Sequence, residues 1–502
     1  MADFETPSIS VPIEIPVLNR GAMKHSAPYL AAPAHQEALG FPEELVDDWQ
    51  TKAIDKLGEL LGKSRALQVY MDSCVKCGAC TDKCHYFLGS GDPKNMPVAR
   101  QDLLRKVYRR YFTWAGKYLP WLVGAEDLTE EVLDDWYIYF HQCSQCRRCS
   151  VYCPYGIDTA EVSMAAREIM DHIGKGQKYC NEILGKVHKI GNNLGLPEPA
   201  LINTVEDLEE DIEEETGVKV RLPVNEKGAD ILLVTPSADF FAEPHVDGLI
   251  GYAKVFHQAG VSWTISSYAS EAANFAMFIG SVEQMKQVAE RIRKAAEDLG
   301  VKRIIFGECG HAWRVAYSFM NTLVGPFDFL DQNYPIPQHI CEFTNDLIEK
   351  GALTLDKSAN DHMTLTFHDS CNVARGSRMG DSPGGQFEIP RAIIKACCNN
   401  FYDMAADTIH ENTYCCGGGG GLLTDDLIEL RTKGAAPRMQ ALQEVVDEHG
   451  VTHMAAICAI CKSQFAKVMP SYGFDMDNIV SVHQLVSNAI ILDGQVRETS
   501  TQ

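Results

Sequence analysis

The sequence has no long apolar run and no excess of basic residues. No stretch approaches the roughly 20 consecutive apolar residues that a helix needs to cross a bilayer, and the start MADFETPSIS lacks the basic-then-apolar order of a secretory signal. With 45 Lys and Arg against 68 Asp and Glu, the net charge is −23, which argues against a nucleic-acid-binding protein because such proteins need a basic face. We therefore expect a soluble, cytoplasmic protein.

The composition is that of a folded chain rich in cysteine. Of the 502 residues, 45% are hydrophobic and 23% are charged, so the chain can bury sizeable cores. Its length indicates roughly three domains. The 18 cysteines need an explanation. Disulfide frameworks are typical of small secreted domains, whereas this density in a large cytoplasmic chain indicates metal ligation or catalysis.

Eight cysteines form two runs, CVKCGACTDKC and CSQCRRCSVYC, with the same spacing, C-x2-C-x2-C-x3-C. This is the bacterial ferredoxin pattern, in which three cysteines hold one [4Fe–4S] cubane and the fourth crosses to the other. Zinc prefers four ligands in two pairs, so two identical groups of four disfavour it. We predict one cubane at Cys74, Cys77, Cys80 and Cys153, and a second at Cys84, Cys143, Cys146 and Cys149.

The first run departs from the ferredoxin pattern at His85, which stands where a proline usually follows the last cysteine. We interpret His85 as a packing or outer hydrogen-bonding residue, and a hydrogen bond to a cluster sulfur that shifts the potential is the alternative. Residues 86–142 contain the basic and aromatic stretch RQDLLRKVYRRYFTWAGKYLPWL. In an acidic chain this stretch favours a helical surface for a partner subunit or an acidic electron carrier.

Changes in composition divide the chain into five segments. Residues 1–65 begin proline-rich and without periodicity, which predicts an extended arm. Residues 66–200 form the two-cluster ferredoxin-like domain. Residues 201–228 form an acidic linker in which Val205, Leu208 and Ile212 are spaced for one helical face. Residues 229–355 and 356–495 form two further modules.

The two modules alternate short apolar runs with longer segments of helical period. This order predicts α/β modules with parallel sheets behind a mainly helical two-cluster domain. In such sheets functional groups lie just beyond the carboxyl ends of the strands. The predicted strands are residues 231–235, 261–266, 301–307, 363–369, 404–410 and 454–458.

Five cysteines of the second module follow predicted strands: Cys371, Cys415, Cys416, Cys458 and Cys461. The first module has the same layout with fewer thiols, since Ser266 and Ser267 stand where a pair would be and Cys309 follows the next strand. The interval from Ser267 to Cys309 equals that from Cys416 to Cys458. We therefore predict two copies of one module, of which only the second kept its ligand set.

Five convergent thiols are one more than a cubane or a zinc ion needs. Soft thiolates favour iron–sulfur chemistry, so an unusual [4Fe–4S] site in which a thiolate bridges two irons is the leading interpretation, with Cys309 arriving from the facing module. Buried core cysteines are the alternative for these five. We adopt that alternative for Cys180, Cys341, Cys397 and Cys398.

Two histidines and a glycine run complete the candidate site. His311 and His368 lie near the cysteines and could supply a proton to a leaving thiolate, whereas Asp369 is expected to brace the turn. The glycines of TYCCGGGGGLLTD are followed by no Lys-Ser or Lys-Thr, which weakens a nucleotide site. We expect them to permit a sharp turn and to leave room above the irons for a substrate sulfur.

The pattern C-x43-CCG-x40-C-x2-C from Cys371 to Cys461 resembles the CCG domain of the heterodisulfide reductase family. A two-cubane domain followed by two CCG modules is similar to the HdrD-type members of that family. The wording of GECGHAW, HDSCNVARGSRMG and TYCCGGGGGL, together with the first cysteine run, is most similar to the DsrK-type subunits of the DsrMKJOP membrane complexes of sulfur-metabolising prokaryotes, including those that carry out sulfate reduction.

The resemblance implies an oxidoreductase that acts on sulfur groups, with two cubane clusters and one non-cubane [4Fe–4S] cluster. It implies that a haem b membrane subunit (DsrM-like) draws electrons from quinol, and that the substrate is the disulfide or trisulfide form of the small sulfur-carrier protein DsrC. The chain would then be peripheral on the cytoplasmic face of the membrane. Because the first module departs from the full cysteine pattern, we expect a single catalytic cluster.

Two other functions remain open. Similar subunits serve as electron conduits for flavin-dependent 2-hydroxy acid or glycerol-3-phosphate dehydrogenases, and this alternative predicts two-electron chemistry only with a flavin partner. A redox sensor would lose or convert its cluster under oxidant and show no turnover.

Overall fold

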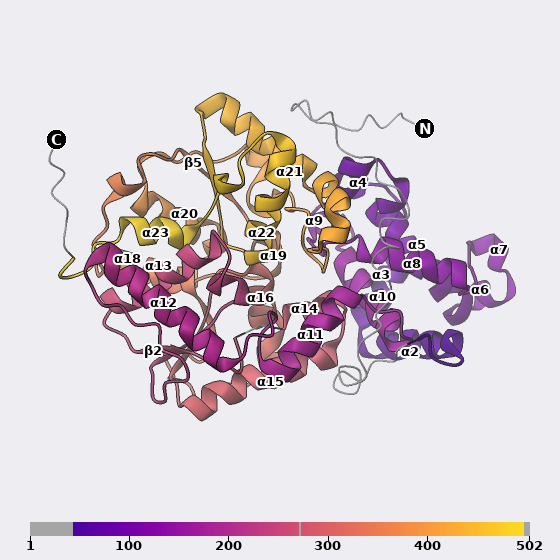
Figure 1. Ribbon diagram of the computed structural model, residues 1–502. Helices are drawn as coiled ribbons and strands as arrows, with labels where there is room; N and C mark the ends of the chain where they lie inside the picture. The colour runs from indigo at the N-terminus through magenta and orange to yellow at the C-terminus, as the bar shows by residue number, and fades with distance from the viewer. Residues whose placement is uncertain (1–43, 271–272, 496–502) are drawn as a thin grey trace.

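The computed structural model describes residues 44–270 and 273–495. Figure 1 shows a helical domain on one side of the molecule and two α/β modules on the other. The helical domain packs around the buried side chains of Leu57, Leu104, Trp136 and Ile169. Its helices are α2 (Trp49–Lys63), α3 (Arg65–Ser73), α4 (His85–Ser90), α5 (Pro97–Phe112), α6 (Trp114–Tyr118), α7 (Pro120–Val123), α8 (Glu130–His141), α9 (Arg148–Val151) and α10 (Thr159–His172).

The N-terminal arm predicted over residues 1–65 falls mostly outside the described residues. Within them, the prediction of an extended chain is wrong, because residues 49–63 form α2, which buries Ala53 and Leu57. These apolar side chains follow a helical period and pack on the helical domain, so burial decides their conformation.

Two helices lead from the helical domain to the modules, α11 (Lys178–Ile190) and α12 (Glu198–Thr216). The predicted helical face of α12 is confirmed, since Val205, Leu208 and Ile212 are buried while most of its acidic side chains are exposed. This face packs on the core of the first module, so the acidic segment forms part of that module's wall.

Module 1 is built on a parallel sheet of order β2-β1-β3-β4. Its buried strands are short and apolar, as expected for a sheet covered on both faces. The strands are β1 (Ile231–Val234), β2 (Trp263–Ile265), β3 (Arg303–Phe306) and β4 (Gln338–His339), and the helices are α13 (His245–Gln258), α14 (Asn274–Phe278), α15 (Val282–Leu299), α16 (Gly310–Val315), α17 (Asn321–Val324) and α18 (Ile340–Glu349).

Module 2 repeats this arrangement on a parallel sheet of order β5-β6-β7. The predicted fold class, a helical domain followed by α/β modules with parallel sheets, is confirmed. The strands are β5 (Leu365–His368), β6 (His453–Ala456) and β7 (Ile479–Ser481), and the helices are α19 (Cys371–Gly376), α20 (Gly385–Cys397), α21 (Ile428–His449), α22 (Ala459–Val468) and α23 (Val482–Ala489).

One predicted strand is wrong. Residues 404–410 form irregular backbone and short 3-10 segments. In the described part of the chain, the β-bridge that this segment's neighbourhood makes with β5 joins Leu365 and Phe401. This stretch has few large apolar side chains and includes the charged Asp407, so it has little to bury against β5. Cys415 and Cys416 therefore lie in a loop after this bridge. The strands β4 and β7 were not predicted.

The modules meet along α13 and α23, which lie side by side (Figure 1). A Cβ atom at Gly251 of α13 would lie 2.0 Å from the carbonyl oxygen of His483, so only glycine permits this approach. The carboxyl ends of β3 and β6 lie together, since the backbone N–H of Ala459 donates to the carbonyl oxygen of Glu308. The helical part reaches the modules through contacts of α4 with α21 and of α10 and α11 with α14.

Candidate functional site

The two ferredoxin-type loops have the same backbone shape. Lys76 and Gln145 occupy matching positions between the first two cysteines of each run, and both have left-handed φ angles, 57° and 56°. Gly78 and Arg147, one position after the second cysteine, are also left-handed, at 80° and 63°. A non-glycine residue adopts this conformation only where the surroundings impose it. Each loop therefore turns its three thiols towards one centre.

The thiols gather around two small cavities in the way that the ferredoxin pattern predicts. One cavity is lined by Cys74, Cys77, Cys80, Cys149 and Cys153, and Cys77 is exposed. The other is lined by Cys84, Cys143, Cys146 and Cys149, and Cys84 and Cys146 are buried. One site thus faces the surface and the other faces the modules.

His85 lies between the second cavity and module 2. Its side chain is buried, with Nε2 2.7 Å from Ser144 Oγ and Nδ1 2.7 Å from the carbonyl oxygen of Gly434. It also lies close enough to the Cys415 thiol to interact with it electrostatically. A proline could make none of these contacts. His85 therefore links the loop of the second predicted cubane to the pair Cys415 and Cys416 of the third predicted cluster.

The five cysteines predicted at strand ends do converge, and all five are buried. Cys371 is the first residue of α19 after β5, Cys458 is the N-cap of α22 after β6, and Cys461 lies one turn further. The sulfur atoms of Cys371 and Cys415 are 3.9 Å apart. Three different segments thus place thiols at one point because the carboxyl ends of β5 and β6 are adjacent.

Hydrogen bonds connect these thiols into one continuous series. Cys415 accepts hydrogen bonds from Cys371, Cys416 and, in the helical domain, Cys146. These bonds lower the pKa of the Cys415 thiol despite its burial. The series then continues from Cys416 through Cys461 and Cys458 to Cys309 of module 1.

The glycine run does not leave room for a substrate. A Cβ atom at Gly420 would lie 2.6 Å from the carbonyl oxygen of Cys143, and one at Gly421 would lie 2.6 Å from the sulfur of Cys180. The space that the glycines leave is filled by the loop of the second predicted cubane. The expectation of an open space above the cysteine pair is therefore wrong, and the glycines instead allow the helical domain to approach it closely.

Two arginines hold this approach: Arg167 is buried and Arg375 is half-buried. Arg167 of α10 donates hydrogen bonds to the carbonyl oxygens of Cys143 and Gly420, joining the two loops. Burial lowers the pKa of Arg167 to about 10, so it remains charged at neutral pH. Arg375 donates to the carbonyl oxygens of Cys146 and Thr413. Two positive charges thus lie among the thiols.

The predicted proton donors have different surroundings. His311 is buried with Nδ1 3.6 Å from the sulfur of Cys458, and its Nε2 has no hydrogen-bond partner among the described residues. His368 is buried too, and burial, together with Arg438, lowers its pKa to about 3. Its imidazole is therefore neutral at pH 7. Asp369 forms a two-point ion pair with Arg391, which agrees with a bracing role.

A buried charged cluster joins the modules and was missed from the sequence. Glu308, at the end of β3, accepts hydrogen bonds from Lys462 and Ser481 and lies 2.7 Å from Nδ1 of His483. Burial would raise the pKa of Glu308, but Lys462 and His483 lower it to about 2. Glu308, His483 and Cys341 are close enough to hold a metal ion, but the ammonium of Lys462 takes the cation's place.

The donor sets fit iron–sulfur clusters. The two small cavities are bordered by five and four thiols, in each case from both runs. The third group offers the five strand-end thiols and Cys309, all buried, with two neighbouring guanidinium groups to offset thiolate charge. Among the cysteines assigned to the core, Cys180, Cys341, Cys397 and Cys398 are all buried. Cys180 packs against the glycine run, and Cys341 lies beside Glu308.

Comparisons with known proteins agree with this geometry. A family model described as a 4Fe-4S dicluster domain matches residues 70–157. The chain is 40% identical to Hdr-like menaquinol oxidoreductase iron-sulfur subunit 2 of Archaeoglobus fulgidus, over 89% of this chain and 85% of that protein. It is 41% identical to the corresponding subunit of Archaeoglobus profundus, over 89% and 84%.

A more distant relative is the D-subunit of the dihydromethanophenazine:CoB–CoM heterodisulfide reductase of Methanosarcina mazei. It is 23% identical over 84% of this chain and 95% of that protein. No helix in the described ranges has both the length and the apolar character that crossing a membrane requires.

Proposed function

We propose that this chain, which belongs to the family of Hdr-like menaquinol oxidoreductase iron–sulfur subunits, passes electrons from quinol to a sulfur–sulfur bond. As a member of that family it is an iron–sulfur oxidoreductase subunit. The observation that carries the proposal is the unbroken series of thiols from Cys146 of the helical domain to Cys309 of module 1. Clusters held by neighbouring thiols of this series would lie next to one another, and electrons could then pass from cluster to cluster between the two domains.

We assign three clusters to these thiols. The exposed cavity would hold a cubane on Cys74, Cys77, Cys80 and Cys153, and the inner cavity a cubane on Cys84, Cys143, Cys146 and Cys149. The third would be a non-cubane [4Fe–4S] cluster on Cys371, Cys415, Cys416, Cys458 and Cys461, with Cys309 as a further ligand. When bound, these clusters supply one-electron transfer and, at the third, an iron site for a substrate sulfur.

The reaction takes two electrons and two protons. A disulfide RS–SR′ becomes RSH and R′SH, and a trisulfide RS–S–SR′ becomes RSH and the persulfide R′SSH, as one S–S bond breaks. In either case one quinol becomes one quinone and releases two protons and two electrons. The protein's part is to hold the reacting sulfur in a site without bulk water and to deliver protons. His311 is the residue best placed for proton delivery, because its Nδ1 lies beside Cys458.

The substrate that fits this proposal best is a sulfur carrier of the DsrC type, in its disulfide or trisulfide form. The support is the resemblance of GECGHAW, HDSCNVARGSRMG and TYCCGGGGGL to DsrK-type subunits. Within this proposal the chain works in dissimilatory sulfur metabolism on the cytoplasmic face of the membrane, as a peripheral subunit.

The membrane partner is proposed to be a haem b subunit that docks on α6 and α7. These two short helices project from the helical domain at the edge of the molecule (Figure 1). Their side chains include Trp114, Tyr118 and Trp121, which are 71%, 69% and 78% exposed. Exposed aromatic residues with one polar end are typical of protein interfaces near membranes. This arrangement supports the expectation that residues 86–142 meet a partner subunit.

A single-turnover assay tests the proposed function. The anaerobically reduced subunit, freed of excess reductant, is mixed with trisulfide-loaded carrier protein, and released thiols are measured by mass spectrometry. We expect cleavage by the wild type and by Cys398→Ala, whose buried thiol lies outside the site, but not by Cys415→Ala. If the wild type requires a flavin partner before it turns over, the electron-conduit alternative replaces this proposal.

A second assay tests the docking surface. Trp121→Ala should weaken binding to membranes that contain the haem b subunit, whereas Tyr402→Ala, which removes an aromatic group 40% exposed on module 2, should not. Equal binding by both variants would place the partner elsewhere.

A further inference from the structure

The two modules can be matched residue by residue at their strand ends. Cys309 and Cys458 are both N-cap residues of the helix after the matching strand, with φ and ψ of −136° and 105° in one and −139° and 121° in the other. Three positions on, Ala312 of α16 therefore matches Cys461. Ser237, the first residue of the short helix after β1, matches Cys371, the first residue of α19 after β5.

A cavity of about 70 Å³ lies at the strand ends of module 1. Its wall includes Thr235 and Ala238 near the end of β1, and Cys309 and Ala312 near the end of β3. Of these, Cys309 and Ala312 match Cys458 and Cys461 of module 2, and Ala238 follows the position that matches Cys371. The cavity therefore occupies the part of module 1 where the repeat would place a second cluster.

The residues that replace thiols in module 1 are engaged elsewhere. Ser237 Oγ accepts a hydrogen bond from the backbone of Asn193. Ser267 Oγ donates to Glu198, 2.8 Å away, and Ala312 has no ligand atom. Neutral hydroxyl groups of this kind are poor ligands for iron–sulfur clusters, which are held by thiolates. The space of the second cluster thus remains without its ligand set.

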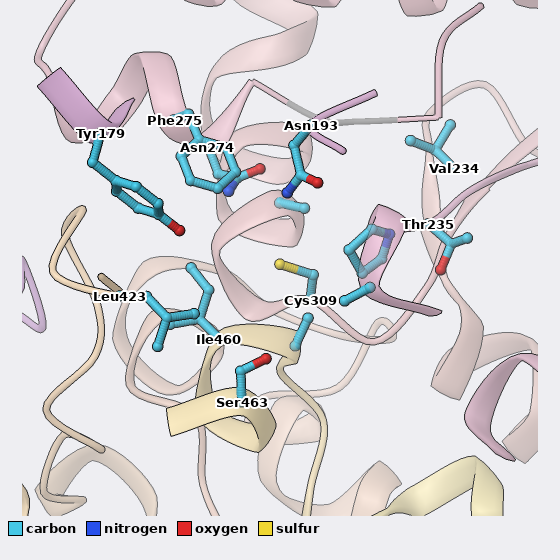
Figure 2. Close-up of a pocket in the computed structure, with 14 residues that line it drawn as sticks. Tyr179, Asn193, Val234, Thr235, Asn274, Phe275, Cys309, Leu423, Ile460 and Ser463 are labelled. Carbon is cyan, nitrogen blue, oxygen red and sulfur yellow. The ribbon is translucent and has the colours of Figure 1, made fainter. Parts of the chain in front are cut away.

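The cavity joins the surface to the thiol series. Its rim contains half-buried residues, Tyr179, Asn193 and Ser463, and its floor contains buried Cys309. Figure 2 shows the sulfur of Cys309 directed into this space, with the three rim residues around it. Because Cys309 is hydrogen-bonded to Cys458, a group that reaches the floor lies next to the end of the series.

The lining selects for neutral ligands. Its residues are apolar apart from hydroxyl, amide and thiol groups, and no charged side chain of the described residues lines it. A volume of about 70 Å³ accepts on the order of five water-sized groups, at about 15 Å³ each. This is enough for a CH2–S–S–CH2 unit but not for a peptide segment. Anions such as sulfite or phosphate would find no compensating charge.

We propose that this cavity, the remnant of the second cluster position in module 1, binds the neutral di- or trisulfide unit of the substrate and presents its sulfur to the cluster at Cys309. This inference rests on the proposed function and adds where the S–S bond enters.

The test narrows the rim and measures binding separately from turnover. Ala238→Trp and Ser463→Phe place bulk at half-buried rim positions, and Val282→Trp places the same bulk at a position 47% exposed on α15. Iron content and the spectra of the cubanes establish that each variant is loaded. The oxidised subunit, which has no electrons to give, is titrated calorimetrically with bis(2-hydroxyethyl) disulfide. Cleavage of the same probe by the reduced subunit is then measured.

We expect both rim variants to weaken binding and to raise KM at least tenfold, with cubane reduction unchanged and Val282→Trp like wild type. Rim variants that bind and cleave like wild type would overturn the cavity assignment, as would a wild type that does not bind the probe. A wild type that binds the probe without cleaving it after reduction would overturn the proposed function and leave the cavity in place.

Discussion

Modules 1 and 2 share one plan and differ in what stands at the ends of their strands. Both follow a first strand with a short helix, and both cap a later helix with a cysteine, Cys309 or Cys458. Module 2 adds four more thiols, whereas module 1 has serines and an alanine at the matching positions, and a cavity beside Cys309 and Ala312. The two similar modules thus have converging thiols, which we propose as cluster ligands, in one half and open space in the other.

The largest difference should come from matching substitutions in the two modules. Cys416→Ser removes a thiol of the series, so we expect loss of the third cluster's iron and loss of S–S cleavage to background. Ser267→Ala, at the matching position of module 1, should leave iron content and turnover near wild type because that hydroxyl bonds Glu198. Iron analysis and the single-turnover assay measure both. Similar iron loss in the two variants would show that module 1 also holds a cluster.

A smaller effect is expected where the modules are joined by charge. Lys462→Met leaves Glu308 buried without its ammonium partner, and breaking a buried pair costs about 3–5 kcal/mol. The exposed pair of Lys302 and Asp230 is shorter, at 2.6 Å, but solvent screens it. Denaturant titration should therefore show a large loss of stability for Lys462→Met and no measurable change for Lys302→Met. Equal losses would mean that Glu308 does not hold the modules together.

The smallest effect concerns the glycine run of module 2. Gly420→Ala combines a φ of +71° with a Cβ atom 2.6 Å from Cys143, and we expect a loss of roughly 2–3 kcal/mol together with slower electron transfer between domains. Gly300→Ala in module 1 has a φ of +69° but nothing within 4 Å, so it isolates the backbone strain. Stopped-flow reduction measures the rate of electron transfer in both variants, and so distinguishes the effect of the close contact at Gly420 from that of backbone strain. Normal electron transfer in Gly420→Ala would show that the close approach has no kinetic role.

Much of the site was predictable because cysteine spacing reports local geometry. The two C-x2-C-x2-C-x3-C runs predict loops that turn three thiols inwards, and the structure gathers their thiols around two cavities, with Cys149 lining both. Strands β1, β2, β3, β5 and β6 were predictable from apolar runs. Strands β4 and β7 were not predictable, because each has only two or three residues and is followed directly by a helix.

Other features depend on contacts between segments far apart in the sequence. Arg167 binds loops at Cys143 and Gly420, and no local pattern connects these positions. Glu308 is part of GECGH, which draws attention to its cysteine, yet its partners Lys462 and His483 belong to the other module. The glycine run was interpreted correctly as a turn and incorrectly as open space, because the loop that fills it comes from another domain.

By itself the sequence determined the kind of chemistry, since thiolates at ferredoxin spacing and a CCG pair suit iron–sulfur clusters and few other groups. It also determined, through apolar periodicity, that strands alternate with helices in both modules, and it placed five of the seven strands in the described residues. Only the tertiary structure decided which thiols are neighbours, that the glycines admit the cubane loop, and that the open space lies at Cys309. Those properties depend on how two sheets and a helical domain pack, and packing is set by the shapes of surfaces that meet only after folding.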